Sequence, residues 1–93
     1  MTKLNLYING AYVAAEGDRT FTRANPISGE VVTEAAAASL NDVARAVDAA
    51  AGAFATWSAT SPGERRKKLL AASENLIARS DDIVQAMKDE IGA

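Results

Sequence analysis

Side chains able to perform chemistry are sparse in this 93-residue sequence, which contains neither cysteine nor histidine. Without them the chain has no thiolate nucleophile, no imidazole base and none of the commonest metal-binding side chains. Serine is frequent, but its hydroxyl becomes a nucleophile only beside a base, and neither histidine nor a suitably placed lysine is available. The six glycines form no GxGxxG or GxxxxGK phosphate-binding pattern. The sequence therefore predicts no catalytic residue and no cofactor-binding residue within this chain.

Charged residues gather at two places, Arg65–Lys68 and Asp81–Asp82. The basic run could meet a nucleic-acid backbone, but no aromatic residue interleaves with it to stack on bases, so a solvated helix face is favoured. Glu64 stands four residues before Lys68, which is the spacing of a local ion pair on a helix. The two aspartates point about 100° apart on a helix, so they suit the positive end of the helix dipole rather than a shared metal ion.

The overall charge and hydropathy exclude several further classes of protein. The formal net charge of −2 provides no field that would select nucleic acid or an anionic membrane. No apolar run approaches the length of about 18 residues that a membrane span requires, and the N-terminus lacks the apolar core of a signal peptide. These features predict a cytoplasmic protein whose partners include neither nucleic acid nor a membrane.

The first third of the sequence is typical of β-structure. Asn9-Gly10 lies between the apolar runs Leu4–Ile8 and Ala11–Ala14, and this pair favours a type I′ hairpin turn with positive φ at both residues. Asn25-Pro26, followed by Ser28-Gly29, is interpreted as a structural turn rather than a ligand loop. The other expected elements are strands at 20–24 and 31–35 and a turn at 16–19.

The remainder is typical of three helices, each marked by capping residues. Ser39 with Asp42, and Ser61 with Glu64, place a serine N-cap three residues before an acidic side chain. Pro62 fits the first helical position, where its missing N–H costs nothing. The third helix is expected to begin at Ser80 and to end at Gly92, whose residue type suits a left-handed C-cap.

The expected helices carry apolar stripes made mostly of small residues. Phe54 and Trp57, at helical spacing, are interpreted as core residues rather than as the lining of a pocket. Alanine is the commonest residue, and its small area gives a weak hydrophobic term at about 25 cal/mol per Å² buried. Backbone ordering opposes folding by roughly 1–2 kcal/mol per residue. We therefore expect marginal stability without a partner surface and no cooperative transition on heating.

Several of these features occur together in an order that resembles the N-terminus of the aldehyde dehydrogenase superfamily over nearly the whole sequence. They are the hairpin 7–13, the segment 25–32, the helix start 42–50, Ala53-Phe54 with Trp57, the segment 62–66, and Leu69-Leu70. Many members have Glu-x-Gly-Lys where this chain has Glu90–Ala93. That departure, with Val31–Glu34 and Pro62–Arg66, resembles the branch acting on aromatic aldehydes such as salicylaldehyde, vanillin or benzaldehyde.

The resemblance implies an α/β, aldehyde dehydrogenase-like fold for the parent enzyme. Residues 1–93 would form the N-terminal part of its cofactor-binding domain, with strands at about 4–36 and helices at about 40–92. The parent would use NAD or NADP to oxidise an aldehyde to the carboxylic acid, through a cysteine and a glutamate that lie elsewhere, and would form a homodimer or homotetramer. The 93-residue chain would be inactive alone.

The resemblance maps one minor site onto this chain, the backbone carbonyl of Ala24, which several members use to bind a monovalent cation. Two alternative functions stay open from the residues themselves: a self-contained helical interaction module without catalysis, and nucleic-acid binding through Arg65–Lys68. The sequence stops one residue after Gly92 with no closing element, so we expect a portion of a longer protein.

Overall fold

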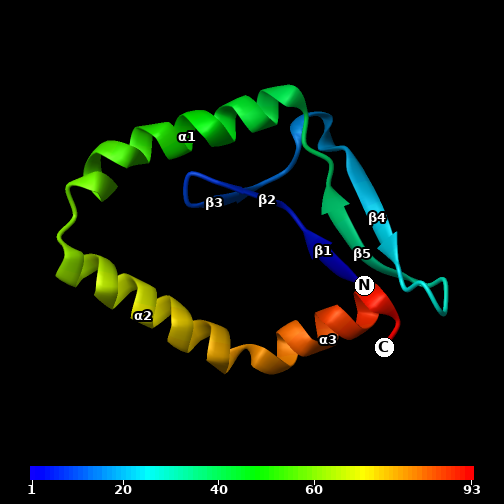
Figure 1. Cartoon of the computed structure of the whole chain (residues 1–93). Helices are drawn as coiled ribbons and strands as arrows, with labels where there is room; N and C mark the ends of the chain where they lie inside the picture. The colour runs from blue at the N-terminus through cyan, green and yellow to red at the C-terminus, as the bar shows by residue number, and fades with distance from the viewer.

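The chain folds into an open, flat ring rather than a compact globule. The computed structural model describes all 93 residues and places a three-stranded sheet on one side of the ring and three consecutive helices around the rest, with the two termini close together (Figure 1). A separate hairpin projects into the opening beside the first helix. The ring measures 48 × 34 × 15 Å and its radius of gyration is 16.8 Å. A compact chain of this length would have a radius of gyration of about 12 Å.

Five short strands form two small sheets. They are β1 (Thr2–Leu4), β2 (Leu6–Ile8), β3 (Ala11–Val13), β4 (Thr20–Ala24) and β5 (Val31–Ala36). In the larger sheet β5 is central, with β1 parallel on one side and β4 antiparallel on the other, while β2 and β3 form a separate antiparallel hairpin. The segment Glu16–Asp18, expected to be a turn, is a short 3-10 helix.

The hairpin turn is confirmed, but the expected single strand at Leu4–Ile8 is wrong. Asn9 and Gly10 have φ of 53° and 77°, as a type I′ turn requires. The run is divided at Asn5, because β3 is only three residues long and its register with β2 ends at Leu6. The residues before Asn5 pair instead with the free edge of β5. Alternating hydrophobicity marks a strand but does not identify its partner.

The three helices begin where the capping residues predict, and the third also ends at its predicted C-cap. They are α1 (Leu40–Ser58), α2 (Pro62–Ala78) and α3 (Ser80–Ile91). The Ser61 hydroxyl accepts a hydrogen bond from the Glu64 N–H at 3.2 Å. Gly92 has φ of 76° and donates its N–H to the Lys88 carbonyl at 2.8 Å, which is the predicted left-handed C-cap. None of the three has the length and apolar character needed to cross a membrane.

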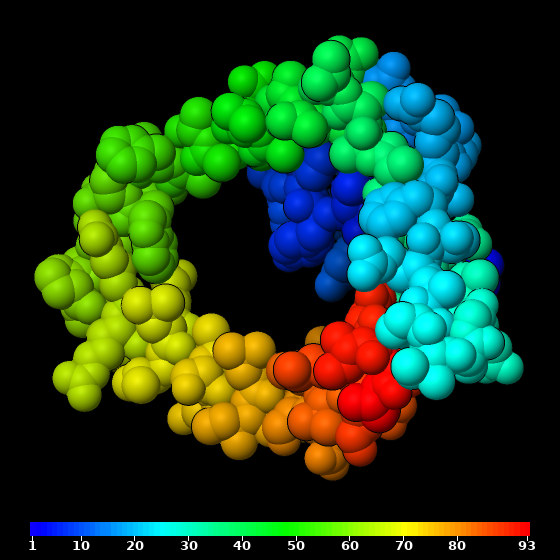
Figure 2. Space-filling view, turned by 45° about the vertical axis from the view of Figure 1, so that its right-hand side comes forward, coloured from blue at the N-terminus to red at the C-terminus, as the bar shows by residue number.

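Almost nothing in the ring is buried. Only Ala15 and Asp42 are inaccessible to solvent, and the helices surround an opening that their side chains do not fill (Figure 2). The prediction that Phe54 and Trp57 are core residues is therefore wrong within this chain, since they are 69% and 42% exposed. The helical spacing correctly marks an apolar face, and β2 contacts the first half of α1, but Phe54 and Trp57 in the second half stay exposed.

Candidate functional site

The polar side chains gather at three junctions of the ring rather than at one pocket. In this structure no three Asp or Glu side chains come together in a group that could hold a metal ion. The junctions lie where α3 meets the sheet, where α1 meets the 3-10 helix, and where α1 meets α2.

The turn between β4 and β5 is held by Asn25. Its side-chain Oδ1 accepts hydrogen bonds from the backbone N–H of Ile27 at 2.9 Å and of Ser28 at 3.2 Å. Its own N–H donates to the Glu30 carbonyl at 2.8 Å, and its carbonyl accepts from Gly29 at the same distance. This confirms the structural turn, because the asparagine side chain satisfies the amides that a tight turn leaves unpaired.

Ala24, the sequence-predicted cation ligand, is the last residue of β4 and immediately precedes that turn. The pairing register between β4 and β5 is irregular between Arg23 and Ala24. Beside it, the Glu90 carboxylate of α3 accepts from Arg23 Nε at 3.2 Å and from the Thr33 hydroxyl at 3.3 Å. The structure therefore places the Ala24 backbone at the junction of α3 with the sheet.

Gly92 completes the same junction by packing against the turn. A Cβ atom at Gly92 would lie 3.1 Å from Asn25 Oδ1, 3.2 Å from Ile27 Cβ and closer still to Ile27 Cγ1. Only glycine permits this approach, and the positive φ of Gly92 favours it as well. We call Arg23, Asn25, Ile27, Glu90 and Gly92 the ring closure, since they join α3 to the strand side. Sequence reasoning identified Gly92 as a helix end but missed this contact.

Asp42 forms the second junction and is the most buried side chain in the chain, at 1% exposure. Its Oδ2 accepts hydrogen bonds from the backbone N–H of Ser39 and of Glu16, each at 2.9 Å, and its Oδ1 contacts the Arg45 guanidinium. These donors, Ser39 first and Glu16 second, hold the pKa of Asp42 well below its usual range, against an opposing effect of burial. Asp42 therefore joins α1 to the 3-10 helix.

The Ser39 and Asp42 pair is a complete capping box, stronger than the sequence pattern indicated. The Ser39 hydroxyl accepts from the Asp42 N–H at 3.1 Å while Asp42 accepts from the Ser39 N–H. Sequence reasoning missed the bond to Glu16, which is 26 residues away. No local pattern announces such a partner.

Arg65 fixes the third junction, the corner between α1 and α2. Its guanidinium donates to the Thr60 carbonyl at 3.0 Å and to the Ser58 carbonyl at 2.9 Å. Its Cζ lies 5.6 Å from the centroid of the Trp57 ring, within the range of a cation–π contact. Arg65 thus satisfies carbonyls near the end of α1 instead of presenting its charge to a phosphate backbone.

The rest of the basic run, residues 66–68, is a solvated helix face, as expected. The ion pair within it differs from the predicted one. The Glu64 carboxylate lies 3.4 Å from Lys67 Nζ, three residues on, and not beside Lys68. Both spacings place side chains on the same side of a helix, so the sequence does not choose between them. The pair is well exposed and contributes little to stability.

Comparison with known proteins identifies the family that shares this sequence. The sequence model of the aldehyde dehydrogenase family matches residues 12–93. Vanillin dehydrogenase from Pseudomonas fluorescens is 46% identical over 86 residues, which are 92% of this chain and 18% of that relative. The chain thus spans less than a fifth of the length of such relatives.

Solved structures give the same result for the fold. A salicylaldehyde dehydrogenase from Pseudomonas putida G7, complexed with salicylaldehyde, superimposes with a TM-score of 0.96 at 36% identity, over 100% of this chain and 19% of that one. The structure of PnpE in complex with nicotinamide adenine dinucleotide gives a TM-score of 0.85 at 35% identity, over 91% of this chain and 18% of the other. The chain belongs to the aldehyde dehydrogenase family.

Proposed function

We propose that residues 1–93 are the N-terminal part of the cofactor-binding domain of an NAD(P)-dependent aldehyde dehydrogenase. The complete enzyme would oxidise an aromatic aldehyde, of the salicylaldehyde, vanillin or benzaldehyde type, to its carboxylic acid. The main support is the superposition of the whole chain on 19% of a salicylaldehyde dehydrogenase with a TM-score of 0.96. The 46% identity to a vanillin dehydrogenase supports the same aromatic class.

The chain's own contribution to this reaction is structural. The overall reaction consumes the aldehyde, water and NAD(P)+ and yields the acid, NAD(P)H and a proton. The thiol nucleophile cannot come from this chain, which has no cysteine. Bound NAD or NADP would supply the hydride acceptor, and we assign no residue of this chain to hold it. The ring closure, the Asp42 junction and the Arg65 corner instead fix where the strands and helices stand.

A fusion protein tests this proposal. The 93-residue chain replaces the matching segment of the salicylaldehyde dehydrogenase from Pseudomonas putida, and NADH formation from salicylaldehyde is followed by absorbance. We expect activity within about tenfold of the relative, a loss of no more than about 1.4 kcal/mol in transition-state stabilisation, and none from the 93-residue chain alone. The control is the relative with its own segment rejoined at the same position. An active control beside a soluble but inactive fusion would contradict the proposal.

The Ala24 carbonyl is proposed as one ligand of a monovalent cation in the complete enzyme. A carbonyl oxygen is the kind of ligand that hard cations take, and Ala24 ends a strand at an irregular pairing step beside a fixed turn. Crystals of the fusion protein soaked in a thallium(I) salt should show an anomalous peak within coordination distance of this oxygen. Strong thallium peaks elsewhere, with none beside Ala24, would refute the assignment.

The oligomeric state, the location and the partners of the complete enzyme are also proposals. It would be a cytoplasmic homodimer or homotetramer that binds its aldehyde substrate and neither nucleic acid nor a membrane. The net charge of −2 and the engagement of Arg65 within its own fold support this. Light scattering of the fusion protein and fractionation of expressing cells measure the assembly and the location. A monomer would contradict the proposed assembly, and recovery in the membrane fraction would contradict the proposed location.

A further inference from the structure

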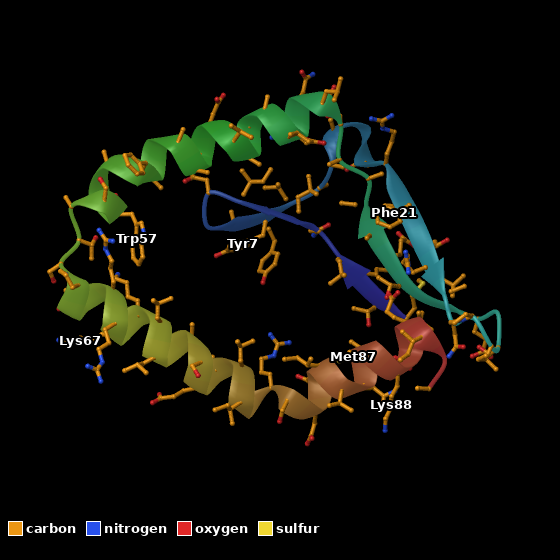
Figure 3. The ribbon with its side chains drawn as sticks, viewed as in Figure 1. Tyr7, Phe21, Trp57, Lys67, Met87 and Lys88 are labelled. Carbon is orange, nitrogen blue, oxygen red and sulfur yellow. The ribbon has the colours of Figure 1, made fainter.

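Large apolar side chains face the opening of the ring, while lysines point away from it. In Figure 3 Tyr7 and Trp57 project toward the opening, whereas Lys67 and Lys88 project outward. Tyr7 is 64% exposed although it packs against Tyr12, and Trp57 is 42% exposed although Arg65 lies over its ring, so both remain accessible to a partner. At these four residues the inner side of the ring carries aromatic rings and the outer side carries charge.

The helical repeat extends this division along α2 and α3. Leu69 and Leu76 follow Lys67 by two and nine residues, which places them about 200° and 180° around the helix from that outward lysine. Ile83 precedes Lys88 by five residues and lies about 140° from it by the same reasoning. On α1, Val43 lines a pocket together with Tyr7. The name inner apolar face is used below for six residues that are 41–65% exposed: Tyr7, Val43, Trp57, Leu69, Leu76 and Ile83.

The exposed area is too large for a chain that stands alone. The accessible surface is 7270 Å², whereas a compact protein of 9.7 kDa exposes about 5,100 Å². The excess of about 2,100 Å² is more than twice the roughly 800 Å² that one partner contributes to a standard interface. An excess of this size matches the permanent, largely apolar interfaces that form when a domain core is divided in two.

We infer that the inner apolar face is the docking surface for the other four-fifths of an aldehyde dehydrogenase polypeptide, and that this chain docks there even as a separate molecule. The inference rests on the proposed function. The chain superimposes over its full length on 19% of the salicylaldehyde dehydrogenase chain, so the ring is the conformation that this segment has while the rest of that polypeptide is present. Because we expect the free chain to be marginally stable, the free energy gained from covering the inner apolar face must also offset the cost of ordering the chain.

Docking in trans is tested with two polypeptides. The 93-residue chain, carrying a fluorophore at its N-terminus, is titrated with the salicylaldehyde dehydrogenase of Pseudomonas putida from which the matching segment has been deleted. Binding is followed by fluorescence anisotropy and NADH formation is measured in the same samples. We expect saturable one-to-one binding and activity that rises with occupancy. Self-association of the labelled chain without binding to the deleted enzyme would overturn the inference in favour of a second copy as the occupant.

Two matched double variants of α2 test which face binds. Leu69→Ser with Leu76→Ser removes apolar area from the inner face, where both leucines are more than 60% exposed and pack on little within the chain. Lys67→Ser with Glu74→Ser places the same number of serines about 20° apart on the outer side and leaves the net charge unchanged. We expect the inner variant to raise Kd at least about 100-fold and the outer variant to change it less than about threefold.

The covalent fusion separates this inference from the proposed function. An active fusion with no binding in trans would overturn the docking inference alone, while an inactive fusion would overturn both. Equal weakening by the inner and outer variants would show that the inner face is not the docking surface. Circular dichroism of the free variants guards against loss of helix, because a variant with wild-type helicity and lost binding reports on the surface itself.

Discussion

Replacing Gly92 by alanine is expected to weaken the ring closure by about 2–5 kcal/mol. A side chain at this residue must adopt a φ of 76°, which costs an L-residue roughly 1–2 kcal/mol. Its Cβ must also displace Ile27 and the Asn25 side chain, and overpacking of this kind costs about 1–3 kcal/mol. Because Asn25 holds the turn before β5, the displacement should propagate to the Ala24 backbone at the end of β4.

Hydrogen exchange in the fusion protein measures this change locally. The Gly92 amide, which donates to the Lys88 carbonyl, should lose protection by about 30-fold or more, the factor that corresponds to 2 kcal/mol. The matched control is Gly52→Ala in the middle of α1, where an added Cβ meets nothing within 4 Å. That change should stabilise the helix by about 0.5–1 kcal/mol. Unchanged protection at the Gly92 amide would mean that the closure does not depend on glycine.

Gly92 also shows which features of the structure can be predicted from the sequence and which cannot. The residue type and its place after an apolar stripe predict the end of α3 correctly, because capping depends on residues within one helical turn. The same holds for Ser39, for Ser61 and for the Asn9-Gly10 turn. The contact of Gly92 with Ile27 spans 65 residues, and nothing near either residue specifies it. Local chemistry predicts elements, and long-range contacts position them.

The candidate site likewise has features that the sequence predicts and contacts that it does not predict. The lack of cysteine and histidine is enough to predict that this chain supplies no thiol nucleophile and no imidazole base. The bond from Glu16 to Asp42, the pairing of β1 with β5 and the contact of Glu90 with Arg23 all join distant segments, and no periodic pattern encodes them. Likewise, the amphipathic spacing of Trp57 indicates an apolar face that needs a covering partner, but it does not say where that partner lies.

Replacing Asp42 by asparagine should destabilise the junction of α1 with the 3-10 helix in a manner that depends on pH. The carboxylate accepts N–H groups from Ser39 and Glu16 and contacts Arg45, so the folded state favours its charged form and lowers its pKa. The unfolded chain has the ordinary aspartate pKa of about 3.9. Stability from Asp42 is therefore fully present above about pH 5 and is lost progressively as the pH falls through 4 and below.

The uncharged asparagine cannot show this dependence, and its NH2 group would face the Arg45 guanidinium, donor against donor. We expect the apparent unfolding temperature of the fusion protein to fall by at least a few degrees in Asp42→Asn at pH 7. The difference from the wild type should shrink toward pH 3, because the unfolded wild-type chain then takes up a proton at Asp42 that the folded carboxylate does not take up. Asp48→Asn is the control, because Asp48 is an exposed residue of the same helix that forms no ion pair or side-chain hydrogen bond.

A constant difference between Asp42→Asn and the wild type from pH 7 to pH 3 would mean that the charge of Asp42 does not hold the junction. A loss of the same size in Asp48→Asn would assign the effect to the net charge of α1. The predicted result, a pH-dependent loss confined to Asp42, would show that one buried carboxylate fixes α1 against the strand side. Because Val43 follows Asp42 directly, the same bonds would set where the inner apolar face begins.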